Sequence, residues 1–248
     1  MFRISTEKMR SSHLLAIVFI LAFAGAALGQ VAPPYPPPPY PPAQRPGRVP
    51  ERPLVVQYIS GEVSVAPKDT SDWSVARLNQ SLRAGQYIWT GKDSRVEIAV
   101  GNGFVRMDSE ASVTLLAANR STMQIGVNQG EVTVTILRLA PGEIYEIDTP
   151  NATLTATKSG VYRVEVRPNL DQTVVTTRKG AIVATGQGSA VTVNSGQQMV
   201  FVNKTSLQHT VMKAPPRDGF EDWASVRDQR LKSSYPPGVV VGFGPYPY

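Results

Sequence analysis

The stretch EIYEIDTPNATLTATKSGVYRVEVRPNLDQTVVTTRKGAIVATGQGSAVTVNSGQQMVFV, residues 143–202, decides the fold class of this 248-residue chain. It holds five or six short runs in which apolar and polar side chains alternate, with glycines between the runs. In the run 161–166, Tyr and Val at the even positions alternate with Arg163 and Glu165. Alternation together with enrichment in Val, Thr and Tyr is typical of half-buried β-strands. The stretch therefore predicts a β-sheet with one apolar and one polar face.

The same alternation continues toward the N-terminus, and no segment before residue 218 has a helical period. The dipeptide Asn102-Gly103 between two alternating runs indicates a β-hairpin. In the run that begins at Ser74, we expect Val75 to face the core. We predict an all-β fold, a single β-domain of many short strands over residues 54–212, closed either as a β-solenoid-like stack or as a sandwich. The strands expected before residue 143 are Val55–Ser60, Glu62–Val65, Ser74–Asn79, Leu82–Thr90, Ser94–Val100, Phe104–Asp108, Ser112–Leu116, Met123–Val127 and Glu131–Leu139.

Residues 1–29 have the three parts of a secretory signal peptide. Basic residues precede the apolar run 14–28, and the small residues Ala27 and Gly29 stand at positions −3 and −1 of a cut before Gln30. The alternative is an uncleaved anchor helix, for which the apolar run is short. Either way, we expect the rest of the chain to be exported to the periplasm or beyond a bacterial cell.

Residues 30–53 form a proline-rich linker, in which nearly every second residue is Pro. Proline lacks an amide donor and fixes φ, so this segment favours polyproline II and cannot join a sheet. This segment is either a disordered linker or a semi-rigid spacer that presents Tyr35 and Tyr40 to a partner.

Residues 213–248 form a C-terminal appendage, with a short helix followed by a tail rich in aromatic residues and proline. Asp218 with Glu221 three residues later is a capping-box arrangement. Phe220 and Trp223 then follow at helical spacing. These two side chains either pack on the protein's own sheet or form a face that docks on a partner.

The composition argues against several kinds of chemistry. The chain has no cysteine, and its two histidines are His13, in the leader, and His209. A single remaining histidine leaves no two-histidine zinc site, and we expect His209 to be structural. The net charge of +6 is mild and not clustered, which is weak evidence for nucleic-acid binding. We expect no catalytic, cofactor-binding or metal-binding residues; the nearest candidate for a carboxylate pair or a calcium site is the alternating set Glu143, Glu146 and Asp148.

Several motifs together resemble the FecR-like domain family over roughly residues 55–203. The most specific are Thr149-Pro-Asn-Ala ahead of an apolar strand and Gly160-Val-Tyr-Arg-Val, with Val161 where the family commonly has Thr. Others are Gly61-Glu-Val, the run 82–90 and Arg178-Lys-Gly-Ala-Ile-Val. The resemblance implies an all-β periplasmic module that makes protein contacts and is known best from surface signalling. Members that regulate a sigma factor carry a cytoplasmic domain before a membrane helix, whereas here 13 residues precede the apolar run.

These observations predict a non-enzymatic exported FecR-like β-module that acts in protein–protein or cell-envelope contacts, with a role related to signalling. The alternative is a module that binds cell-wall polysaccharide or peptidoglycan through exposed aromatic side chains. A membrane-anchored sigma-factor regulator is a third reading, and it requires an uncleaved leader. We expect no cofactor, no nucleic acid and no stable membrane span after cleavage. The candidate interaction residues are Trp73, Trp89, Phe220, Trp223, Tyr35 and Tyr40.

Overall fold

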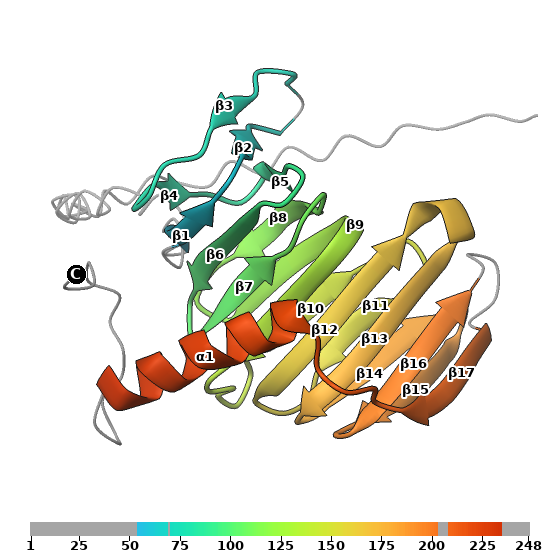
Figure 1. The fold of residues 1–248 in the computed structure, drawn as a ribbon. Helices are drawn as coiled ribbons and strands as arrows, with labels where there is room; N and C mark the ends of the chain where they lie inside the picture. Colours follow the sequence, from blue (N-terminus) through green and yellow to red (C-terminus); the bar gives the residue numbers. More distant parts are fainter. Residues whose placement is uncertain (1–53, 69, 203–207, 235–248) are drawn as a thin grey trace, which may run out of the picture. The chain divides into compact units, whose positions relative to one another are not determined.

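The computed structural model describes residues 54–68, 70–202 and 208–234. The segments predicted as a leader and as a proline-rich linker with Tyr35 and Tyr40 lie outside these residues, as does the predicted tail after residue 234. The described residues form seventeen β-strands, a short 3-10 helix η1 (Pro168–Leu170) and one α-helix, α1 (Gly219–Ser234) (Figure 1). The expected all-β fold with a short C-terminal helix is confirmed.

Strand pairing joins all the strands into one continuous sheet that is folded into two layers, which we call layer I and layer II. Every pair is antiparallel except β9–β10, which is parallel. The strands of layer I, from edge to edge, are β4 (Ser81–Leu82), β1 (Leu54–Ser60), β6 (Arg95–Val100), β7 (Gly103–Met107), β9 (Thr122–Ile136), β12 (Gly160–Arg167), β13 (Gln172–Lys179), β16 (Gln197–Val202) and β17 (Gln208–Lys213). Those of layer II are β3 (Ser74–Val75), β2 (Val63–Ala66), β5 (Tyr87–Thr90), β8 (Ser112–Ala118), β9 again, β10 (Ile144–Asp148), β11 (Thr153–Ala156), β14 (Ala181–Gly186) and β15 (Ser189–Asn194).

The long strand β9 belongs to both layers. Residues 122–129 pair within layer II, and residues 130–136 pair within layer I. The change of layer occurs at Gly130, whose φ is +80°, a conformation that glycine adopts without strain. A side chain there would also lie 2.6 Å from the Cα of Ala111. The sequence pattern predicts two separate strands over this region, and the structure has one.

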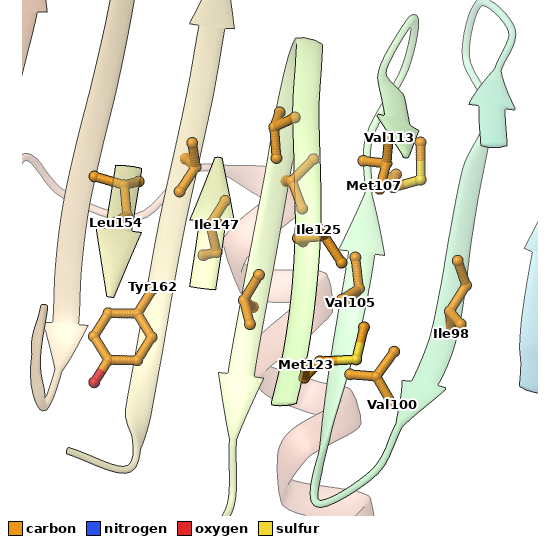
Figure 2. Packing of buried hydrophobic residues seen from close by; sticks show 14 of the residues in the cluster. Ile98, Val100, Val105, Met107, Val113, Met123, Ile125, Ile147, Leu154 and Tyr162 are labelled. Atoms are coloured by element: carbon orange, nitrogen blue, oxygen red, sulfur yellow. The ribbon is translucent and has the colours of Figure 1, made fainter. Parts of the chain in front are cut away.

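The hydrophobic core fills the space between the two layers. Inward-facing side chains of layer I, such as Val100 and Val105, meet Met123, Ile125 and Ile147 of layer II (Figure 2). Alternation accounts for this arrangement, because in β12 the even positions are buried and the odd positions are not. Of the two closed forms left open by the sequence, the structure is therefore the sandwich-like one, with two facing layers around one core.

Two local expectations had different outcomes. The hairpin at Asn102-Gly103 is confirmed, since β6 and β7 pair up to Val100 and Gly103. The expected strand Ser74–Asn79 with Val75 inward is wrong. Only two residues pair, and Val75 is 72% exposed. The chain leaves the sheet after Val75, so that Ala76 is buried instead and Asn79 adopts a positive φ.

Candidate functional site

The outward face of layer I is charged and is covered by α1. Along each strand the residues between the core-facing positions point to this face, and they place arginines and glutamates side by side on five neighbouring strands. Helix α1 runs across these strands (Figure 1). The charged residues of this face that contact one another or α1 are Arg95, Glu97, Arg106, Glu131, Arg163 and Arg178.

Helix α1 begins at a capped N-terminus. The Oδ1 atom of Asp218 accepts hydrogen bonds from the amides of Phe220 and Glu221, at 3.1 and 3.0 Å. This is the N-cap that the sequence predicts. The side chain of Glu221, however, is 5% exposed and bonds to arginines of the sheet. The helix start is thus anchored to layer I as well as capped.

The first of two ionic clusters is centred on Glu97, which is 2% exposed. Its Oε2 accepts from the Nε of Arg106 at 2.6 Å and from the Nε of Arg227 at 2.8 Å, while its Oε1 accepts from Nη2 of Arg227 at 2.8 Å. The fully buried Arg106 also donates to Thr135 at 3.0 Å and lies 2.8 Å from Oδ1 of Asp228. Adjacent strands and the helix therefore share one buried network of two arginines and two carboxylates.

The second cluster is centred on Arg163 of β12. This guanidinium lies 2.6 Å from Glu131, 2.7 Å from Asp218 and 3.1 Å from Glu221. Arg178 also binds Glu221, with its Nε 2.6 Å from Oε1, and donates to the carbonyl of Pro215. Three carboxylates are gathered around two arginines, so the cluster carries an excess of negative charge when all three are ionised.

These surroundings shift the pKa values of the carboxyl groups in opposite directions. Burial raises the pKa of Glu131 to about 7, against the nearby charge of Arg163. The Oε1 atom of Glu131 is buried and has no hydrogen-bond partner among the described residues. Burial alone would also raise the pKa of Glu97, but the hydrogen bond from Arg227 and the charge of Arg106 hold it below its usual value. For Asp218 burial is likewise outweighed, by the amide of Glu221 and by Arg163, and its pKa is lowered.

Aromatic side chains close the same interface at the N-terminal half of α1. Phe220 is 2% exposed, and its ring stacks on Trp223 with centroids 5.7 Å apart. Trp223 also lies 5.4 Å from the ring of Tyr58, and the guanidinium of Arg95 is 5.4 Å from the Trp223 centroid. The structure thus places the predicted interaction residues Phe220 and Trp223 against the protein's own sheet.

The other two described aromatic candidates lie on layer II. Trp73 precedes β3 and is 50% exposed. Trp89, in β5, is half-buried and stands in register with Ser64, which is in turn paired with Val75. Residues paired side by side share a face, so Trp89 and the exposed Val75 look outward from layer II together, and Tyr87 joins them by alternation along β5. This outward strip of Tyr87, Trp89 and Val75 is not covered by α1.

The remaining sequence candidates have local roles. Glu146 and Asp148 both accept from the side-chain amide of Gln124, at 2.7 and 2.9 Å, and Glu143 accepts from the amide of Ala140 at 2.8 Å. Within the described ranges there is no group of three or more His, Cys, Asp and Glu side chains that could hold a metal ion. His209 lies on β17 beside the ring of Phe201. Separately, an open hollow of about 490 Å³ lies beside Glu131, Asp108 and Arg167.

Sequence reasoning missed the charged face under α1. The signal was present, because charged residues recur at the outward positions of consecutive strands and acids recur on one side of the helix. What alternation cannot show is whether an outward face meets water or another element. The pairs also join residues far apart in the chain, up to the 130 positions between Glu97 and Arg227.

One protein-family model matches the central part of this chain. Residues 86–183 match the family model described as "FecR protein", so the chain contains a FecR-like domain, as the motifs predict. The match runs from β5 into β14, and it is shorter than the segment 55–203 over which the sequence motifs resemble the family. The comparison with curated proteins gave no match.

Two solved structures from Parabacteroides distasonis ATCC 8503 are similar, each described as a "putative anti-sigma factor". One is 14% identical with a TM-score of 0.45, covering 51% of this chain and 59% of that chain. The other is 13% identical with a TM-score of 0.48, covering 62% and 79%. This chain therefore spans less than two thirds of the first structure's length. In the described residues, no helix has both the length and the apolar character needed to cross a bilayer.

Proposed function

We propose that this protein is a non-enzymatic, exported FecR-like module that works through contacts with proteins of the cell envelope, in a role related to signalling. The observation that carries the proposal is the FecR match over residues 86–183, set within an all-β domain. The leader-like residues 1–29 support export, and the proline-rich residues 30–53 suit a spacer.

The exposed side chains of layer II are the surface that we assign to these contacts. Trp73 and Val75 are large apolar groups open to solvent, and the face that bears Val75 also bears Tyr87 and Trp89. Aromatic residues are enriched where proteins meet partners, because they bury a large area at a small cost in conformational entropy. The charged face of layer I is already covered by α1, which leaves layer II as the better candidate.

The test is capture of envelope proteins on the immobilised chain, followed by titration of the recovered partner. We expect Trp73→Ala to weaken binding of that partner by at least about thirtyfold, the range of an interface hot spot. Leu170→Ala is the matched control, since Leu170 is 63% exposed on η1, and it should leave binding unchanged. The proposal fails if no partner binds saturably, or if both variants bind like the parent.

A second candidate is a module that binds cell-wall polysaccharide or peptidoglycan through the same aromatic side chains. The outward placement of Trp89 with Tyr87 on β5 favours it, because sugar rings stack on exposed aromatic faces. Titration with soluble peptidoglycan fragments separates the two functions. Saturable quenching of tryptophan fluorescence that disappears in Trp89→Ala supports the polysaccharide binder, whereas the protein-contact module shows no quenching.

A further inference from the structure

The two layers end in open strands at the same end of the sheet. Layer I ends in β17, which pairs only with β16, and layer II ends in β15, which pairs only with β14 among the described residues (Figure 1). Both strands are six residues long, and the β16–β17 register runs without a bulge. Each strand therefore presents a straight row of backbone donors and acceptors along its outer edge.

The five side chains of β17 from His209 to Lys213 are exposed, and they lie on both faces of the layer. Val211 is paired with Met199, which is 1% exposed in the core, so Val211 points to the core side of the layer and is nonetheless 48% exposed. Met212 points to the other side and is 43% exposed. Strand β17 thus carries an exposed valine on the core side of layer I, beyond the last buried core residues of β16.

The opposite end of the molecule is built differently. There the outermost strands β3 and β4 are two residues long, and β1 contains a register shift between Val56 and Tyr58. Short edge strands and bulges are the devices by which β-proteins prevent pairing between edges. Only the β15 and β17 end lacks them.

We propose that β17 pairs antiparallel with β17 of a second copy of this chain, so that layer I continues across a twofold axis. An axis normal to the layer requires residues of the same face to lie opposite each other. Val211 opposite Val211 of the second copy satisfies this condition, brings the two uncovered valines together and sets Lys213 opposite His209. The two lysines then lie at opposite ends of the pair, where they do not repel each other directly.

Layer II favours the same partner. Strand β15, Ser189-Ala-Val-Thr-Val-Asn194, carries no charged side chain, so nothing in its sequence repels a second β15. A twofold axis through β17 brings the two β15 strands to the same interface. A second copy offers both layers a matching edge, whereas a single strand from another protein would serve only one.

Sedimentation equilibrium of the full purified chain tests this proposal. Across roughly a hundredfold range of concentration, the average mass should rise from one chain toward two. Val211→Lys places two lysines face to face on the axis and should weaken dimerisation by at least about tenfold. Leu78→Lys is the matched control, because it puts the same charge on an exposed apolar residue at the protected end, outside the surface assigned to partner contacts, and its mass curve should follow the parent.

Hydrogen exchange of the unmodified chain is a second test, and it does not depend on whether the Val211→Lys variant folds. The amides of β17 should exchange more slowly at high than at low protein concentration, while those of β3 should not change. A mass of one chain at every concentration overturns the proposal, as does a Val211→Lys variant that dimerises like Leu78→Lys. Protection of β17 that requires a different protein would assign this edge to that protein instead.

Discussion

At the scale of single residues, Glu131 is the unusual group. It shares the guanidinium of Arg163 with Asp218 and Glu221, and it is directly opposite Glu165 in the β9–β12 ladder. One of its oxygens is buried without a hydrogen-bond partner in the described part of the chain. A proton on Glu131 relieves the excess negative charge, which agrees with its raised pKa of about 7.

This raised pKa predicts a pH dependence of stability. The folded protein holds the proton of Glu131 up to about pH 7, whereas in the unfolded chain the group loses it near its ordinary value of 4.5. The stabilising contribution is therefore complete below about pH 4.5 and is lost as the pH rises through 7. Urea unfolding of the parent and of Glu131→Gln between pH 5 and 8 measures this contribution. As the pH rises across this range, the unfolding free energy of the parent should fall relative to that of Glu131→Gln.

The control for this prediction is Glu62→Gln, which removes an exposed carboxylate outside the cluster around Arg163. Its stability should follow the pH curve of the parent. Glu97 and Asp218 do not interfere, because their pKa values are lowered and their contributions are lost only in more acidic solution. Parallel curves for the parent and Glu131→Gln would show that Glu131 does not titrate in this window.

At the scale of elements, the β6–β7 hairpin depends on close contact with β9. A Cβ added to Gly103 would lie 2.0 Å from the carbonyl oxygen of Thr135, a backbone atom that cannot move alone. We expect Gly103→Ala to lower the unfolding free energy by about 1–3 kcal/mol, the usual cost of overpacking. Chemical denaturation measures the change.

Gly219→Ala provides the comparison, because no atom lies within 4 Å of the position where its Cβ would stand. Alanine is the better helix former, so this second change should be neutral or slightly stabilising. Equal losses in the two variants would mean that the Gly103 contact is not the cause.

The ion pairs of helix α1 determine where the helix lies on layer I, and they contribute little to its stability. Taking charges such as Glu97 and Arg106 out of water costs nearly as much as their attraction returns. The buried apolar surface of the described helix is small, with Phe220 and Ala224 as its fully buried apolar side chains. We infer that the apolar contacts stabilise the docked helix, while the two ionic clusters fix where it lies on layer I.

At the scale of the whole molecule, stability should decrease from the centre of the sheet toward its ends. Strands β9 and β12 have partners on both sides, and β9 takes part in both layers, whereas β3 and β4 pair over two residues each. In native-state hydrogen exchange we expect amides of β9 to exchange slowest and those of β3 and β4 fastest. Exchange from β9 as fast as from β3 would contradict this picture.

Much of this architecture could be predicted from the sequence, because it depends on local signals. Alternation identified the strands of the stretch 143–202, Asn102-Gly103 identified a hairpin, and Asp218 identified the start of α1. What could not be predicted depends on distant contacts. Neither the two facing layers nor the covering of Arg106 by Asp228 follows from spacing along the chain, and Val75 faces solvent because its strand ends after two residues.

The covering of layer I by α1 also bears on the order in which the protein folds. Glu97 and Arg106 meet Arg227 and Asp228 only after more than a hundred further residues have been made, so these contacts have high sequence separation and close late. Until then both charged side chains remain hydrated on an open sheet. When α1 docks, this hydrated surface becomes a buried interface. Docking of α1 is therefore the step that completes the folding of layer I.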